Sequence, residues 1–472
     1  MESGRLRARG LVPLLLLAML VTPAAGGEIQ QGNPKQAPPP QFGASVDLVL
    51  VDVTVVDADG QFVPDLTAAD FRVFEEGREV QVEFFALESF VPDFEAGAAA
   101  TGSSHQAAAA DGEAGSRRPE ATAALTRYIV LCVDGLNTEV PDWLRIRPHL
   151  VRWVQQGLRP NDRVLLAYMG PDGRLRLTRG FSSDPTMLTG ALMQIEANRD
   201  LAFGIREKER DIQESMAVEN VGATTSPLDP ASDVDIASLR QGAKLADIYA
   251  RERRRDVLTG LDVLQSLAQH LADTYLVEGP KVVVLVSGGL PETPGLNYQL
   301  LVAQQAYRAG PTIQMKSGLQ AYQPLTMSRS SGKQITGELI KALGHFNRLN
   351  YTFYTIDASG PFGADGPDLQ SPNPTLTSTQ RSEVEWDEQR GLVLLAEGTG
   401  GLAFTGTVNY ERILQRIDED TSYRYVLGYV PPPHDRKAID KGKFYRIKVE
   451  VQRSGVKVRA RQGYVDGQGG GK

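Results

Sequence analysis

The sequence predicts a mixed α/β protein, in which a doubly wound, mostly parallel sheet is flanked by an all-β, sandwich-like unit built from N- and C-terminal strands. Two observations lead to this prediction. Between residues 125 and 420, short apolar stretches alternate with amphipathic ones, as in parallel α/β domains. On either side, residues 45–90 and 421–466 carry the two-residue alternation that is typical of antiparallel strands.

The first 26 residues have the order of a secretory signal peptide. Arg5, Arg7 and Arg9 precede the apolar run LVPLLLLAMLV, and small residues follow it. The run is shorter than the roughly 20 residues of a membrane span, so we expect cleavage, with an uncleaved anchor as the alternative. We therefore expect an exported protein, periplasmic or extracellular, with no stable membrane span after cleavage.

Charge and cysteine content restrict the possible partners and the sources of stability. The chain has 50 basic and 58 acidic residues, and no basic stripe follows the signal, so we expect no nucleic-acid partner. The single cysteine, Cys132, excludes an intramolecular disulfide. It lies inside an apolar strand, where a lone cysteine is usually a small core residue.

The N-terminal β unit is expected over residues 45–90, after a disordered lead-in at 27–44. "SVDLVLVDVTVV" is apolar on both faces, and Asp59-Gly60 is a turn signal. "DFRVFEEGREVQVEFF" repeats the order of strand, turn and strand. So few strands make a thin core that is marginal alone. Residues 91–124 are rich in Ala, Gly and Ser and are expected to form a flexible linker.

The α/β region is expected to begin at residue 125. Its predicted strands are RYIVLCVD, DRVLLAYM, GRLRLTRGFS, KVVVLVSGG, NYTFYTID and LAFTG. The five consecutive apolar residues of KVVVLVSGG indicate a central parallel strand. Among the predicted helices, PDWLRIRPHLVRWVQQGL should bend or divide at Pro148, and DPTMLTGALMQI should begin at the N-cap Asp184.

Insertions are expected at residues 197–255, 306–335 and 358–384. The first is charged and helical, and one long helix could run from it into the core element that ends at "LADTYL". Its run RERRR (251–255) is interpreted as a solvated helix face, in preference to a basic patch. The other two insertions are rich in Gly, Ser, Pro and Thr and are expected to be surface loops.

Strands return in residues 421–466, and the tail at 467–472 is expected to be disordered. "YRYVLGYV", "KFYRIKVEVQ" and "VKVRARQGYV" alternate apolar and charged residues. Neither these strands nor residues 45–90 can bury two apolar faces alone. We therefore predict that both segments form one β-sandwich, with two separate β caps as the alternative.

Four segments in a fixed order carry a resemblance to a known family. They are VVDADGQFVPDLTAADFRVFEEG, LAEGTGG, YRYVLGY and VKVRARQGY, and with the α/β region they span about Val46 to Tyr464. In this the chain resembles the VWFA-related acidobacterial domain family, a bacterial branch of the von Willebrand factor type A domains. The resemblance implies a type A, Rossmann-like fold, known for adhesion and protein–protein contacts and not generally for catalysis.

The resemblance also implies a metal-ion-dependent adhesion site at the carboxyl edge of the sheet. A hard cation such as Mg²⁺ takes oxygen ligands there. Asp134 matches the first acid of the pattern, and Thr138 matches its second serine. However, Leu136 stands where the first serine should be, and Ser287 stands where the pattern has an aspartate. Thr259 is a candidate for the threonine loop, although its spacing fits poorly.

The expected sheet still brings these residues together. With the strand order 3-2-1-4-5-6, the strands that end at Asp134 and Ser287 flank the switch point. Asn137 could supply an amide oxygen for the missing hydroxyl, or Asp134 could simply cap the loop after its strand. We expect weak or absent Mg²⁺ binding, with a real but altered site as the alternative. The degenerate metal site comprises Asp134, Asn137, Thr138 and Ser287.

The function favoured by these observations is an exported, non-enzymatic protein-binding, adhesion or scaffold protein. An accessory or regulatory component of a cell-envelope complex, with the insertions as docking arms, is the alternative. A serine hydrolase is a third, disfavoured because Leu285 replaces the glycine of a nucleophile elbow and His345 is the sole candidate base for Ser287. The predicted surface for an unidentified protein partner contains Asp134, Asn137, Thr138, Ser287 and Glu292.

Overall fold

The structure, a computed structural model, describes most of the chain beyond its first segment. The described residues are 48–91, 125–216, 233–275, 281–308, 334–361, 376–434 and 442–465. They all belong to the second of two compact units, Asp47–Lys472. The expected signal peptide, lead-in and tail, and all but the first residue of the linker, lie outside them. Within the described ranges, no helix has the length and apolarity to span a membrane.

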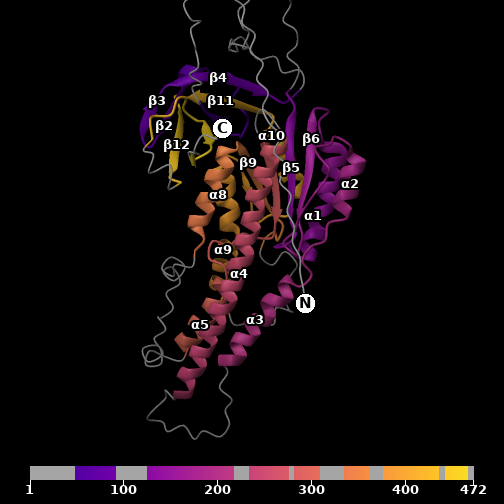
Figure 1. The fold of residues 1–472 in the computed structure, drawn as a ribbon, viewed down its shortest axis with the longest axis vertical. Helices are drawn as coiled ribbons and strands as arrows, with labels where there is room; N and C mark the ends of the chain where they lie inside the picture. Colours follow the sequence, from indigo (N-terminus) through magenta and orange to yellow (C-terminus); the bar gives the residue numbers. More distant parts are fainter. Residues whose placement is uncertain are drawn as a thin grey trace, which may run out of the picture. The chain divides into compact units, whose positions relative to one another are not determined.

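A six-stranded, mostly parallel sheet forms the centre of this unit (Figure 1). Its order is β10-β9-β8-β5-β6-β7, and β7 alone is antiparallel to its neighbour. When the six strands are numbered in chain order from β5 and the sheet is read from β7, this is the predicted order 3-2-1-4-5-6. The strands are β5 (Arg127–Asp134), β6 (Asp162–Met169), β7 (Leu175–Leu177), β8 (Lys281–Ser287), β9 (Tyr351–Asp357) and β10 (Ala403–Phe404).

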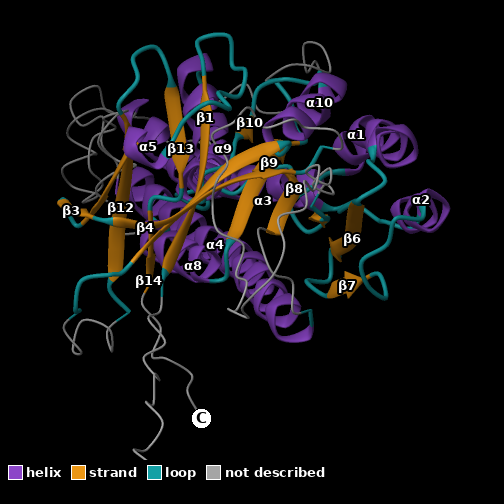
Figure 2. Cartoon of the chain, turned by 90° about the horizontal axis from the view of Figure 1, so that it is seen from above, coloured by secondary structure: helices purple, strands orange, loops and turns teal. Residues whose placement is uncertain are grey.

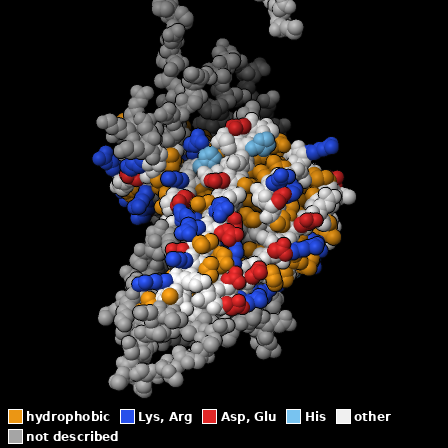
Figure 3. Space-filling model, turned by 60° about the horizontal axis from the view of Figure 1, so that its bottom comes forward, with side chains coloured by type: hydrophobic (Ala, Val, Ile, Leu, Met, Phe, Trp, Pro, Cys, Tyr) orange, Lys and Arg blue, Asp and Glu red, His pale blue; other side chains and the backbone are white. Residues whose placement is uncertain are grey.

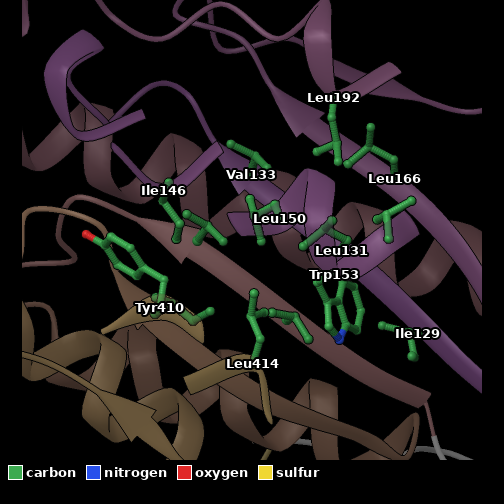
Figure 4. Close-up of a cluster of buried hydrophobic side chains, with 14 of the residues drawn as sticks. Ile129, Leu131, Val133, Ile146, Leu150, Trp153, Leu166, Leu192, Tyr410 and Leu414 are labelled. Carbon is green, nitrogen blue, oxygen red and sulfur yellow. The ribbon is translucent and has the colours of Figure 1, made fainter. Parts of the chain in front are cut away.

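Helices cover both faces of the sheet because its central strands are apolar on both sides (Figure 2). On one face, Leu131 of β5 and Leu166 of β6 pack against Leu150 and Leu414 from the helices (Figure 4). Cys132 points to the opposite core, buried and free as expected. The first face carries α1 (Val140–Arg152), η2 (Trp153–Gly157), α2 (Pro185–Met193) and α10 (Tyr410–Asp420); the other carries α4 (Asp233–Thr274), α8 (Thr336–Arg348) and α9 (Ser378–Gly398).

Pro148 does not divide its helix; division was one of the two predicted outcomes, and a bend was the other. Helix α1 continues through it to Arg152 and passes into the π-helical segment η2. Pro148 is exposed, so water can reach the carbonyl group that the missing N–H leaves free. Asp184 caps α2 as predicted, with its side chain accepting a hydrogen bond from the Thr186 backbone N–H.

Helix α4 is the long helix that the sequence suggested, 42 residues in one piece, which corresponds to about 63 Å. Its second half packs on the sheet, through residues such as Val257 and Leu264. Its first half packs against α3 (Leu201–Met216) and α5 (Leu296–Arg308) in a separate core that includes Ile212 and Leu301. We call α3, the first half of α4, and α5 the arm (Figure 1). The predicted insertion boundary at residue 255 therefore falls inside a continuous helix.

The predicted surface loop at 358–384 is wrong at its end. Helix α9 already begins at Ser378, where Thr377 and Gln380 form a reciprocal capping box. This local cap is a helix start signal that the Gly, Pro and Thr composition of the preceding residues obscures. Residues 362–375 of that insertion, and 309–333 of the one before it, lie outside the described residues.

N- and C-terminal strands combine in two four-stranded antiparallel sheets, and they alternate in the first of them. One sheet has the order β13-β1-β11-β4, and the other β14-β12-β2-β3. Both contribute to one core, in which Val53 and Tyr425 of the first sheet lie with Val73 and Ile447 of the second. The strands are β1 (Val49–Val56), β2 (Phe71–Glu75), β3 (Arg78–Val80), β4 (Val82–Ser89), β11 (Tyr423–Tyr429), β12 (Phe444–Val451), β13 (Lys457–Ala460) and β14 (Gly463–Val465), with the short helix η1 (Ala68–Asp70) between β1 and β2.

Candidate functional site

Asp134 ends β5 at the carboxyl edge of the sheet, and its carboxylate is enclosed by donors. Its Oδ1 accepts from the Asn137 backbone N–H at 3.1 Å, and its Oδ2 accepts from Asn137 Nδ2 at 2.9 Å. The side chain therefore caps the loop that follows its own strand, as the metal-free interpretation of the sequence expected. Asp134 is 4% exposed. Burial raises the pKa of its carboxyl group, and the hydrogen bonds from Asn137 and Ser287 oppose that rise.

Ser287 reaches the same carboxylate from the end of β8. Its hydroxyl oxygen lies 2.8 Å from Asp134 Oδ2 and 3.0 Å from the Gly289 carbonyl oxygen. Thr138 joins the two strand ends, because its hydroxyl donates to the Asp134 carbonyl oxygen and accepts from the Gly288 N–H. A Cβ atom at position 288 would collide with the Asn137 carbonyl oxygen, so the close approach of the two loops requires glycine there.

The fifth side chain of this cluster is Arg253, from the middle of α4. Its Nη1 donates to Asn137 Oδ1 at 2.7 Å, and its Nη2 lies 3.3 Å from Glu388 Oε2 on α9. The Asn137 amide is thus used at both ends, with its NH₂ group toward Asp134 and its oxygen toward the guanidinium group. The Arg253 side chain is 11% exposed, and its charge acts to lower the pKa of Asp134.

These residues do not form a site that fits a divalent metal ion. Both oxygens of Asp134 already accept hydrogen bonds from N–H or O–H groups, and Asn137 Oδ1 is used by Arg253. Leu136 brings no oxygen side chain. In the described ranges, no group of three or more His, Cys, Asp or Glu side chains is placed to hold a metal. The predicted ligands do come together, but as a hydrogen-bonded cluster.

Two other candidates lie away from this cluster. The Thr259 hydroxyl is exposed and donates to the Arg255 carbonyl oxygen within α4, so it does not face Asp134. His345, the candidate base for Ser287, lies on α8 near the start of β9, at the opposite edge of the sheet. Its ring lies beside Phe346 and the Arg348 side chain.

The prediction of an exposed binding surface needs correction, because all five of its residues are buried. Glu292 is 6% exposed; it accepts a hydrogen bond from the Thr336 hydroxyl and pairs with Arg390. Glu292 therefore connects the start of α8 to the middle of α9. The sequence shows that these residues follow strands, but it does not show that helices of the arm and α9 cover them. The five residues are Asp134, Asn137, Thr138, Ser287 and Glu292.

A cleft of about 350 Å³ lies over this edge of the sheet. Asn137, Gly288 and Ser359 line its base, after β5, β8 and β9 respectively. Apolar side chains of the arm and α9, including Ile205 and Val384, line its walls. The lining also carries charges of both signs, from Arg253, Arg381, Glu139, Asp142, Glu209, Glu385 and Glu388. Acidic and basic side chains are likewise interspersed over the described face in Figure 3.

Sequence reasoning missed Arg253, although a signal for it existed. Ala246 and Ala250 precede it on the buried side of α4, and Val257 and Leu261 follow. Arg253 lies between Ala250 and Val257 at helical spacing, so it falls on the stripe that faces the protein. The interpretation of RERRR as one solvated face overlooked this periodicity. It holds for the exposed Arg251 and Arg255 and is wrong for Arg253.

Comparisons with known proteins add little. No family model matches the chain, and no curated protein does. Among solved structures, a crystal structure of an aerotolerance-related membrane protein from Bacteroides fragilis is similar at a TM-score of 0.26 and 9% identity, over 62% of this chain and 98% of that one. A likeness this distant carries no argument about family or function. What stands is a mixed α/β protein with a six-stranded, mostly parallel sheet and two antiparallel sheets.

Proposed function

We propose that this chain is an exported, non-enzymatic protein that binds a protein partner at the carboxyl edge of its central sheet, as an adhesion or scaffold protein. The cleft over the ends of β5, β8 and β9 supports this proposal. In open α/β sheets, ligands bind outside the carboxyl ends of the strands, at the point where the strand order reverses. Here that point lies between β5 and β8, directly beneath the cleft. The type A resemblance of the sequence favours the same edge.

A docking arm is the second candidate function. Large apolar side chains on the arm are exposed: Phe203 on α3 at 58% and Tyr307 on α5 at 67%. Exposed apolar groups of this size are candidates for contact with another protein. The chain would then act as an accessory or regulatory component of a cell-envelope complex, with the arm as its contact.

One pair of variants separates the two functions. Ile205 lines the cleft, whereas Phe203, two residues earlier on the same helix, is exposed. Proteins that co-purify with the wild type from its native envelope should be depleted by Ile205→Asp and retained by Phe203→Asp if the partner binds in the cleft. The reverse pattern would support the docking arm. Loss of neither would contradict both proposals.

Two further measurements test the remaining parts of this proposal. Labelling of Ser287 by an active-site serine reagent would favour a hydrolase; we expect none, because the Ser287 hydroxyl hydrogen-bonds to Asp134 and not to a histidine. Mass spectrometry of the native protein should find a mature N-terminus between Ala24 and Glu28. An intact Met1 would contradict cleavage of the signal.

A further inference from the structure

The hydrogen-bonded cluster at the carboxyl edge of the sheet contains a positive charge that the chain itself supplies. Arg253 reaches the site from α4, and its guanidinium group hydrogen-bonds to Asn137, which in turn hydrogen-bonds to Asp134. It also forms an ion pair with Glu388. A hydrogen-bonded guanidinium group is a fixed, permanently charged cation. One cation therefore faces an amide oxygen, a carboxylate of α9 and, through Asn137, the carboxylate that ends β5.

We propose that Arg253 is a tethered cation that takes the place of a divalent metal at this edge and fixes the arm to the central sheet. The proposal accounts for Leu136 and Ser287, which stand where the resemblance implies a serine and an aspartate as metal ligands. A site with a built-in positive charge does not need those ligands. It concerns the chemistry and regulation of the site, and it holds or fails regardless of whether a partner binds in the cleft.

The neighbouring arginines show that this placement is specific. Arg254 leads away from the site, to Glu338 on α8 and the Gln334 carbonyl oxygen. Arg255 is exposed. Among these three consecutive residues, Arg253 is the one whose side chain reaches both the loop after β5 and the middle of α9.

The contact has a mechanical consequence. Arg253 lies where the sheet-packed half of α4 meets the half that belongs to the arm, between Ala250 and Val257. Its hydrogen bond to Asn137 therefore joins the arm to the loop after β5. Ile205 and Glu209 of α3 line the cleft above the same contact. Loss of Arg253 should allow the arm, α3 included, to move away from the loop after β5 more often, and so change access to the cleft.

Arg253→Met, Arg253→Lys and Arg255→Met test the proposal in the full chain. Arg255→Met removes the same charge from the same helix at an exposed position, so it is the matched control. We expect backbone amides of residues 201–216 to exchange hydrogen about tenfold faster in Arg253→Met. Loss of one charged hydrogen bond should raise the equilibrium constant for local opening by about that factor. Arg253→Lys should lie between Arg253→Met and the wild type, and Arg255→Met should match the wild type.

Added cations provide a second test, because their effect on hydrogen exchange should differ between a cation site and a purely structural contact. Low-millimolar guanidinium should slow exchange in Arg253→Met and leave the wild type unchanged, because it can occupy the vacated position. Millimolar Mg²⁺ should not shift the melting temperature of the wild type. Equal exchange in Arg253→Met and Arg255→Met would overturn the proposal. So would a Mg²⁺-dependent stabilisation of the wild type that Asp134→Asn abolishes, a result that needs no arginine variant to fold.

Discussion

The hydroxyl oxygen of Ser287 lies 2.8 Å from Oδ2 of Asp134, although 153 residues separate them in the chain. They meet because β5 and β8 are neighbouring parallel strands that end at the same edge. This hydrogen bond connects the ends of β5 and β8 at the point where the strand order reverses. Thr138 makes a second connection there, because its hydroxyl accepts a hydrogen bond from the Gly288 backbone N–H. The edge is therefore a structural joint, and its stability can be tested one residue at a time.

Ser287→Ala should lower the free energy of unfolding by about 1–3 kcal/mol, because it leaves a buried carboxylate with one donor fewer. Urea denaturation would measure the loss. Thr259→Ala is the control: it removes an exposed hydroxyl of α4 that bonds within its own helix, and should cost under about 0.5 kcal/mol. Equal losses in the two variants would show that the contact with Asp134 contributes nothing.

Gly391→Ala should destabilise the protein by about 1–3 kcal/mol. The loop after β8 docks against α9, where the Gly391 N–H donates to the Leu290 carbonyl oxygen and the Leu290 N–H donates to the Glu388 carbonyl oxygen. A Cβ atom at position 391 would collide with that Leu290 oxygen. Thermal denaturation would report the change.

Gly190→Ala, inside α2, is the matched control for this change. Nothing lies within 4 Å of a Cβ atom there, so alanine should stabilise the helix by about 0.5–1 kcal/mol. If both substitutions have the same sign, the loop does not dock on α9 as described.

Asp387 should make stability depend on pH. Burial raises the pKa of its carboxyl group to about 7; the backbone N–H of Thr293 opposes the rise, and Glu388 and Glu292 add to it. A carboxyl whose pKa is higher in the folded state binds more protons there. Its stabilising contribution is therefore complete below the ordinary value of 3.8 and is lost as the pH rises through about 7.

Asp387→Asn cannot ionise and should remove this part of the pH dependence, at most about 4 kcal/mol between pH 4 and 7. Melting temperatures of the wild type and the variant should be measured across that range. The difference between the two melting temperatures should narrow or invert as the pH rises. Parallel pH profiles for the two proteins would contradict a raised pKa at Asp387.

Cleavage of the chain near Ala107, outside the described residues, should leave two fragments that remain associated. The first fragment would carry β1 and β4, which both pair with β11 of the second, and β2, which pairs with β12. Size-exclusion chromatography in native buffer would test this. Separation of the fragments in mild buffer would refute a shared sandwich core.

Much of the central sheet could be predicted from the sequence. The apolar run KVVVLVS indicated a central strand, which β8 is, because a strand covered on both faces has no polar side to show. The N-cap Asp184 and the long α4 could also be read, since caps and helical periodicity act between residues close in the chain. Pro148 shows the limit of such local rules, because α1 continues through it without being divided.

The candidate site could be predicted only in part. Asp134 and Ser287 were expected to meet, because parallel strands bring their carboxyl ends to one edge. The burial of Glu292 was not expected, since its contacts with Thr336 and Arg390 join helices distant in the chain. Nor was the cleft, whose walls come from the arm and α9.

The sequence by itself determined the strands and most of the helices, because each depends on residue type and local spacing. The tertiary structure alone decided which side chain meets Asn137 at the carboxyl edge of the sheet. Arg253 lies 116 residues from Asn137, and the two meet because α4 crosses the edge of the sheet where the loop after β5 ends. Such a contact depends on how a helix packs across a sheet, and no local pattern in either segment encodes its partner.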